Sequence, residues 1–245
     1  MIKKQVFAGE GVLASLRNGR DITPQYTREI GYAECDFDRD MYASNGVVCG
    51  TVLAPDPKMD VIFCHGNAQD LVHTLSNAGT AERTVDVLTH VADAMSANVT
   101  AVEYPGYASG SVEASESGCV EAVWAVVRAK LRKLKAKDKK SNRGDYPIIV
   151  CGYSLGCAIA MQCVAKLSTD ASTAPYAHMA RLLLMAPFES AICTVLPRWI
   201  TNTILWPMDM FRTDNVHQIS IPVYILHGKN DAIVPASGSV AILDK

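Results

Sequence analysis

One short stretch constrains the fold more than any other: an apolar run that leads through Gly152-Tyr153-Ser154-Leu155-Gly156 into a segment rich in small residues. The run at 146–151 predicts a buried strand, and the segment at 157–166 is long enough for a helix. A turn this tight leaves no room for side chains two residues before and two residues after Ser154, which explains both glycines. A strand that passes directly into a helix is the building unit of a parallel sheet covered by helices.

The rest of the chain repeats this alternation. Strands are predicted at 46–54, 60–64, 99–103, 181–185 and 221–226, and helices at 84–97, 120–134 and 237–245. The pattern predicts an α/β fold of three layers, with a mostly parallel sheet and helices on both faces. A length of 245 residues suits one such domain, which we place at 29–245, and residues 1–28 are predicted to form an arm or an edge hairpin.

Composition excludes several classes of function. A net charge of −2 gives no reason to expect nucleic acid as a partner. The eight cysteines show neither a C-x-x-C pair nor a zinc-ligand spacing, so no metal and no cofactor are predicted. They are interpreted as small buried side chains of a protein in a reducing compartment, and a cytoplasmic location is expected. No apolar run approaches the ~20 residues that a membrane helix needs.

The one strong charge cluster runs from Arg128 to Arg143. It is interpreted as a solvated helix end followed by a loop, because lysines near a helix C-terminus complement the helix dipole. The alternative is a patch for anionic lipid headgroups, which would give the protein a peripheral contact with membranes.

Ser154 is the candidate nucleophile. The predicted turn places it at a helix N-terminus, where free N–H groups and the helix dipole favour a developing oxyanion. The backbone N–H groups of Leu155 and of Asn67, in the turn after the strand at 60–64, are the candidate oxyanion donors. The alternatives are an inert serine in a glycine-rich turn, and a strand-terminating turn in which His65 is structural.

Asp231 is the candidate acid of a catalytic triad. It lies in the loop that follows the strand at 221–226, at the carboxyl edge of the sheet, where sites form in open parallel sheets. A carboxylate there would orient a histidine and stabilise its charged form. An aspartate that only caps its loop is the alternative, and Glu189 is a second candidate for the acid.

With these residues in place, the chain resembles the α/β-hydrolase superfamily, and within it the Bem46-like and alpha/beta-hydrolase domain-containing 17-type enzymes. The resemblance rests on collinear motifs between residues 47 and 245, which are HGNAQDL (65–71), EYPGYASG (103–110), GYSLG (152–156), MAPFESAICTVLP (185–197) and HGKNDAIVP (227–235). It implies serine hydrolysis of esters or thioesters, with protein depalmitoylation in the closest group. It also implies Ser154 as nucleophile, Asp231 as acid, and Asn67 and Leu155 as oxyanion donors. The cysteine-rich N-terminus of the depalmitoylases has no counterpart here.

The family's catalytic histidine follows the acid in sequence, and here none of the fourteen residues after Asp231 is a histidine. We therefore expect a fragment of a longer hydrolase, in which the last strand and helix are missing. A serine peptidase of the same clan and a catalytically inactive interaction protein are the alternatives. The apolar stretch from Trp199 to Met208 is predicted either to line an acyl pocket or to pack on the sheet. Acyl-chain length, head group and oligomeric state are left open.

Overall fold

The computed structural model describes residues 27–33, 47–67, 69–71, 87–107, 113–138, 146–191, 193 and 209–244. The expectations for residues 1–26, for 139–143 of the basic segment and for the apolar stretch from Trp199 to Met208 lie outside these residues. The chain divides into two compact units. The first comprises residues 1–63 and 68–149, and the second comprises 64–67 and 150–245.

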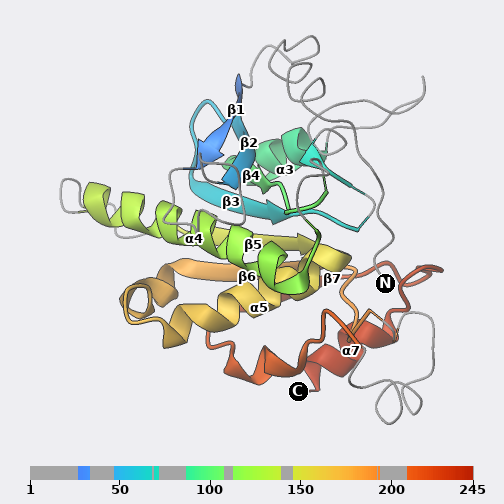
Figure 1. The fold of residues 1–245 in the computed structure, drawn as a ribbon. Coiled ribbons are helices and arrows are strands. Elements are labelled where there is room, and N and C mark those ends of the chain that lie inside the picture. The colour runs from blue at the N-terminus through green and yellow to red at the C-terminus, as the bar shows by residue number, and fades with distance from the viewer. Residues whose placement is uncertain are drawn as a thin grey trace, which may run out of the picture. The chain divides into compact units, whose positions relative to one another are not determined.

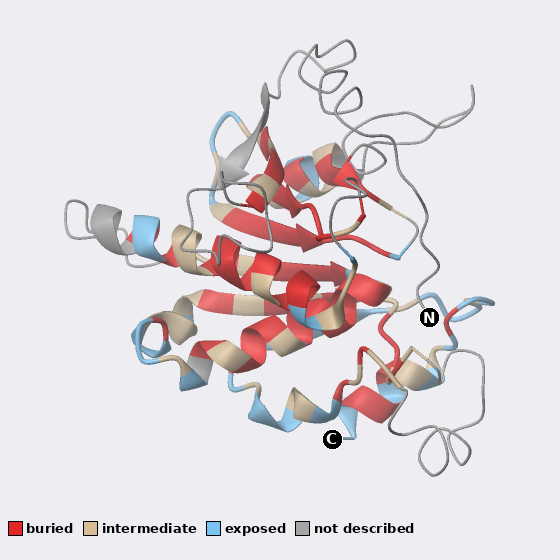
Figure 2. Ribbon diagram, viewed as in Figure 1, coloured by how far each residue is buried: buried red, intermediate tan, exposed pale blue. Residues whose placement is uncertain are grey.

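In the first unit the strands follow the order β1 (Thr27–Ala33), β2 (Val47–Leu53), β4 (Ala97–Val102) and β3 (Met59–Cys64). The pairs β1/β2 and β2/β4 are antiparallel, whereas β3 and β4 are parallel, with Val61 opposite Val99. Helices α3 (Val87–Met95) and α4 (Glu116–Asp138) both contact β2 and β4 (Figure 1). Successive residues of β3 and β4 are buried, and because they point to alternate faces, both faces of this sheet are covered (Figure 2).

In the second unit β5 (Ile148–Tyr153, its first two residues in the first unit), β6 (Ala180–Met185) and β7 (Val223–Leu226) follow in that order. Strands β6 and β7 are parallel, with Leu182 opposite Val223. Helix α5 (Leu155–Thr169) is buried along most of its length, and it contacts β6 and the short helices η1 (Ala174–Met179) and η4 (Asp214–Gln218). Helix α7 (Ser237–Leu243) ends the described chain, and the side chains of β7 are largely exposed.

The elements predicted from sequence are confirmed with shifted ends, and the fold class is confirmed. One of these shifts has a clear physical reason: α3 ends at Met95, and the following strand begins at Ala97, two residues earlier than predicted. The reason is Ser96, whose φ of 47° ends the helix, and whose carbonyl accepts a hydrogen bond from the N–H of Lys58 at 2.7 Å. Strand β1 was not predicted, and it adds an antiparallel strand at the edge of the first unit's sheet.

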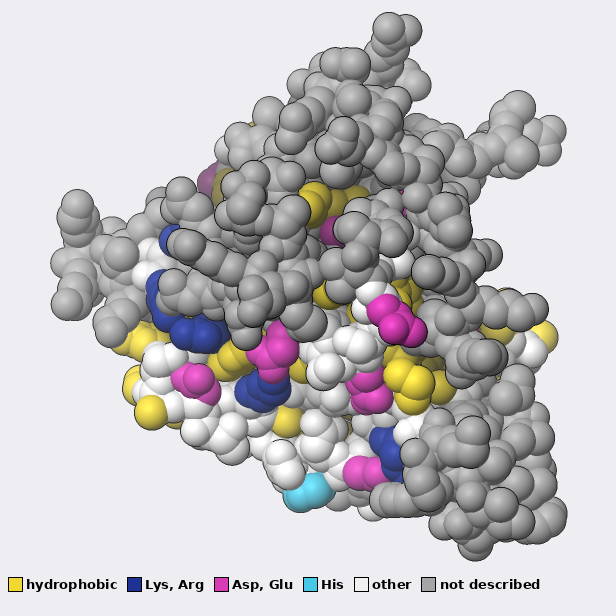
Figure 3. Space-filling model, in the orientation of Figure 1, with side chains coloured by type: hydrophobic (Ala, Val, Ile, Leu, Met, Phe, Trp, Pro, Cys, Tyr) yellow, Lys and Arg dark blue, Asp and Glu magenta, His cyan; other side chains and the backbone are white. Residues whose placement is uncertain are grey.

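Six of the seven cysteines in the described residues are buried, and all seven are free thiols, as their interpretation as small apolar side chains requires. The described part of the basic segment belongs to α4, where Lys130 forms an ion pair with the largely buried Asp60 at 3.3 Å. Figure 3 shows Lys and Arg side chains over α4. Among the helices that the structure describes, none combines the length and apolar character needed to cross a bilayer.

Candidate active site

The Ser154 turn (residues 152–156) has a strained backbone at its centre. Ser154 adopts φ 51° and ψ −118°, a conformation that non-glycine residues rarely occupy. Its N–H donates to the carbonyl of Met185 at the end of β6, at 2.9 Å, and its own carbonyl accepts from the N–H of Cys157 at 2.9 Å. Such strain persists only where the surrounding structure enforces it, and it is typical of functional sites.

Both glycines of the turn are required by close backbone approach. A Cβ on Gly152 would lie 2.5 Å from the Cα of Cys157. A Cβ on Gly156 would lie 2.0 Å from the carbonyl oxygen of Cys64 and 2.8 Å from that of His65. The steric prediction from the sequence is therefore confirmed, and the second glycine brings the start of α5 against the end of β3.

This close approach brings together the segments that carry the two predicted oxyanion donors. Leu155 is the first residue of α5, so its N–H has no acceptor within the helix. Asn67 is exposed, and it lies in the turn that follows Cys64 and His65, the two residues against which Gly156 packs. The His65 ring is fully buried, and its Nδ1 lies 3.0 Å from the carbonyl of Gly66. An oxyanion role for the two N–H groups stays a prediction.

Asp231 lies in the loop after β7 and is held by backbone donors. Its Oδ1 accepts hydrogen bonds from the N–H groups of Ile233 and Val234, both at 2.9 Å. These bonds favour the ionised form and lower the pKa of the carboxyl group below its ordinary value. Asp231 is therefore a carboxylate at neutral pH, as both the predicted acid and the alternative loop cap require.

His227 links the Asp231 loop to α7 through hydrogen bonds. Its Nε2 lies 2.8 Å from the carbonyl of Val234, and because a carbonyl only accepts, Nε2 carries the proton. Its Nδ1 lies 2.6 Å from the Ser239 hydroxyl, and Asp231 Oδ2 is 3.8 Å from Nε2. Both ring nitrogens of His227 are thus engaged within its own loop and helix.

Hydrogen bonds connect the carboxyl ends of the three strands of the second unit. The N–H of Ser154, after β5, reaches Met185 in β6, and the N–H of Ala186 donates to the carbonyl of Leu226 in β7 at 2.8 Å. Ala186 has a φ of 52°, a left-handed conformation immediately after β6. The Ser154 turn and the loop that carries Asp231 are consequently fixed to one edge of the sheet, on either side of β6.

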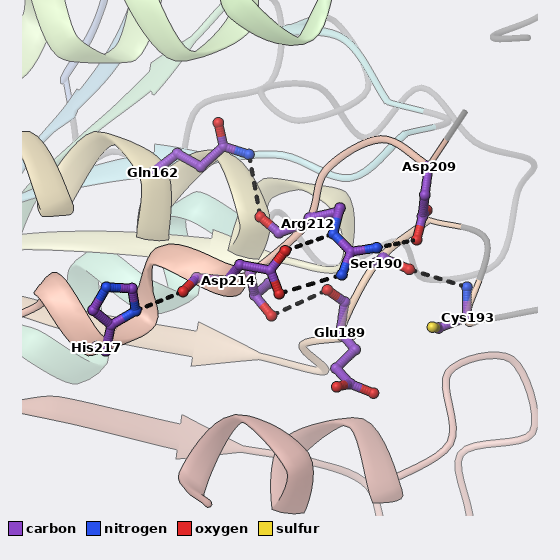
Figure 4. Close-up of polar contacts among 9 residues, drawn as sticks. Gln162, Glu189, Ser190, Cys193, Asp209, Arg212, Asp214 and His217 are labelled. Carbon is purple, nitrogen blue, oxygen red and sulfur yellow. Dashed lines mark hydrogen bonds and ion pairs between the residues drawn. The ribbon is translucent and has the colours of Figure 1, made fainter. Parts of the chain in front are cut away.

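A polar cluster holds the segment after β6 against η4 (Figure 4). The buried Thr213 donates from both its N–H and its hydroxyl to the carbonyl of Glu189, each at 3.0 Å. Arg212 pairs with Asp209 at 3.2 Å and with Asp214 at 2.6 Å. The amide of Gln162, on α5, donates to the Arg212 carbonyl at 3.4 Å, which links the cluster to the helix that follows Ser154.

Glu189, the second candidate for the acid, contributes its carbonyl to this cluster. In Figure 4 its carboxylate points away from the other side chains drawn. The carboxylate of Asp231, in contrast, lies 3.8 Å from the ring of His227.

Within the described residues, no histidine forms a hydrogen bond with the Ser154 side chain. The Nδ1 atoms of His178 and His217 donate to the backbone carbonyls of Pro175 and Asp214, in the short helices before β6 and β7. Both histidines therefore precede strands and lie away from the carboxyl edge of the sheet. The described residues also contain no group of three or more His, Cys, Asp or Glu side chains placed to hold a metal ion.

Sequence reasoning missed three contributors to the Ser154 turn: the Met185 carbonyl, the left-handed Ala186 and the thiol of Cys157. The thiol lies 3.2 Å from the carbonyl of Gly152 and 3.2 Å from that of Met185. Cysteines on this helix were interpreted only as buried side chains, because a sequence pattern does not reveal which carbonyls surround a thiol.

The sequence of this chain is similar to those of several known proteins. Residues 61–227 match a family profile described as the alpha/beta hydrolase family. A protein of Acanthamoeba polyphaga mimivirus named as an alpha/beta hydrolase is 28% identical over 196 residues, which cover 78% of this chain and 62% of the relative. Human alpha/beta hydrolase domain-containing protein 17B is 24% identical over 230 residues, which cover 90% of this chain and 67% of the relative. The chain thus spans about two thirds of the length of these curated relatives.

Solved structures share the fold at low sequence identity. An alpha-beta hydrolase from Vibrio vulnificus superposes with a TM-score of 0.60 at 17% identity, over 99% of this chain and 77% of that one. An esterase from Pyrococcus furiosus superposes with a TM-score of 0.54 at 14% identity, over 92% of this chain and 80% of that one. At this level of identity the likeness shows the fold alone.

Proposed function

Because the chain belongs to the alpha/beta hydrolase family, we propose that it is the main part of a serine hydrolase that cleaves esters or thioesters through an acyl-enzyme intermediate. The observation that carries the proposal is the backbone of Ser154, held at φ 51° between β5 and α5. A strained serine at a helix N-terminus is the arrangement that exposes a nucleophile beside oxyanion donors. Esters and thioesters are the proposed substrates because the motifs at 65–71, 152–156 and 227–235 resemble those of hydrolases that act on these bonds.

In the proposed mechanism the Ser154 hydroxyl attacks the acyl carbon while a histidine accepts its proton. The N–H groups of Leu155 and Asn67 stabilise the oxyanion of the tetrahedral intermediate. The intermediate collapses to an acyl-serine, and the histidine returns the proton to the leaving alcohol or thiol. Water then attacks the acyl-serine while the histidine accepts its proton. The histidine returns this proton to the serine oxygen, which releases the acid and restores the serine.

The proposal assigns the base to a histidine outside these 245 residues. The described histidine rings are engaged elsewhere, with His227 bound to Ser239 and Val234, and the curated relatives are longer than this chain. Asp231 would hold that histidine in the correct tautomer and stabilise its positive charge. The lowered pKa of Asp231 suits this role, because the carboxyl group stays ionised throughout the neutral range.

The same engaged histidines favour a second candidate, a non-catalytic protein that keeps the hydrolase fold as an interaction surface. In that case Ser154 would lack a base and would be a poor nucleophile. The two functions differ in the reactivity of Ser154, which an active-site probe reports directly.

The test is fluorophosphonate labelling of the chain encoded by the longest native transcript. We expect labelling that disappears in Ser154→Ala, and a loss of about 10³- to 10⁴-fold in kcat in Asp231→Asn. The matched control is Asp244→Asn at the exposed end of α7, which should leave both the labelling and kcat unchanged. The rates of hydrolysis of an acyl thioester, an acyl ester and an aminoacyl amide are then compared to identify the substrate class. Labelling that persists in Ser154→Ala, or no labelling of the full-length chain, would contradict the proposal.

A further inference from the structure

Cys157 makes two contacts to the Ser154 turn and a third to Met185, the residue that accepts the Ser154 N–H. Its N–H donates to the Ser154 carbonyl at 2.9 Å. Its thiol lies 3.2 Å from the carbonyl of Gly152, two residues before the serine. The thiol also lies 3.2 Å from the carbonyl of Met185, which is the acceptor of the Ser154 N–H.

The surroundings keep this thiol a hydrogen-bond donor. Cys157 has no solvent exposure, and burial raises the pKa of its thiol well above the ordinary range. The group therefore stays protonated and unreactive, and its S–H is shared between two carbonyls that can only accept. A buried cysteine at this position is thus a polar cross-link between β5 and β6 as well as an apolar filler.

We propose that Cys157 is a positioning residue, whose thiol holds the Gly152 and Met185 carbonyls together and so keeps Ser154 in its strained, reactive conformation. The inference rests on the proposed serine hydrolase function and deepens it. Ser154 keeps a φ of 51° only while the carbonyl that receives its N–H stays in place. The thiol, on the first helical turn of α5, binds that same carbonyl.

The experiment compares Cys157→Ala and Cys157→Val, which lack a donor, with Cys157→Ser, which keeps one. With an acyl ester substrate and the full-length protein, the Ala and Val variants should lose about tenfold in kcat with KM nearly unchanged, because misplacement of a reacting group slows chemistry more than binding. Cys157→Ser should recover most of the loss. Cys163→Ala, at a buried position further along α5, is the matched control and should keep kcat.

Hydrogen exchange of the Ser154 amide provides a readout that needs no activity. The amide should exchange faster in Cys157→Val than in the wild type and in Cys157→Ser, because its acceptor at Met185 is no longer held. Equal kcat and equal amide exchange in all variants would overturn the inference. So would a kcat of Cys157→Ser as low as that of Cys157→Val, or a loss of kcat in Cys163→Ala as large as that in Cys157→Ala. If the wild type is not labelled by a fluorophosphonate, the hydrolase proposal fails, and the exchange data alone decide the positioning role.

Discussion

The replacement of Gly156 by alanine is the sharpest test of the Ser154 turn. The new Cβ would lie 2.0 Å from the Cys64 carbonyl oxygen and 2.5 Å from its carbon. Both neighbours are backbone atoms, so no side chain can rotate away. Favourable contacts lie near ~3.5 Å, so the start of α5 and the end of β3 must separate by about 1 Å or more.

This displacement should affect stability and reactivity together. Overpacking of this kind costs about 3 kcal/mol, and at about 2–4 °C per kcal/mol for a chain of this size, the melting temperature should fall by roughly 6–12 °C. The same movement separates the Leu155 N–H from the turn that carries Asn67. A shift of about 1 Å at a catalytic group costs on the order of 100-fold in rate.

The assay is a thermal melt together with the rate of fluorophosphonate labelling of the full-length protein. Gly228→Ala is the matched control, because a Cβ there meets only atoms of Asp231, at 3.8 Å and beyond. It should change the free energy of unfolding by less than ~1 kcal/mol. The reasoning is refuted if Gly156→Ala keeps the melting temperature and the labelling rate of the wild type. It is also refuted if Gly228→Ala lowers the melting temperature as much as Gly156→Ala does.

Three further predictions concern the same unit and the core. Ser154→Gly should be more stable than Ser154→Ala by about 1 kcal/mol in a thermal melt, the reverse of the usual order, because only glycine relieves a φ of 51°. Thr213→Val should lower the free energy of unfolding in urea by about 1 kcal/mol, since it removes the buried hydroxyl that donates to Glu189; an unchanged midpoint would contradict this. Burial raises the pKa values of the Cys119 and Cys151 thiols from 9.0 to about 12. The free energy of unfolding should therefore be intact below pH 9 and decline as the pH rises from 9 towards 12. Urea unfolding at pH 8 and pH 10 would measure this decline.

The local sequence around Ser154 predicted much of the candidate site. Periodicity and turn residues located the strand before Ser154 and the helix after it, because both depend on neighbours in the chain. The need for Gly152 and Gly156 also followed from the tightness of the turn. Element ends were less predictable: Ser96 ends α3 in a left-handed conformation that is stabilised by Lys58, a residue far away in sequence.

The sequence by itself determined the α/β alternation, the position of the serine between strand and helix, and the position of Asp231 in the loop after the last described strand. Only the tertiary structure decided which backbone atoms meet at the Ser154 turn. The carbonyl of Met185, the left-handed Ala186 and the thiol of Cys157 come together because parallel strands end at one edge of the sheet, and no local pattern encodes that meeting. The strained serine therefore depends on Met185, a partner on another strand, which is why its motif alone does not fix its reactivity.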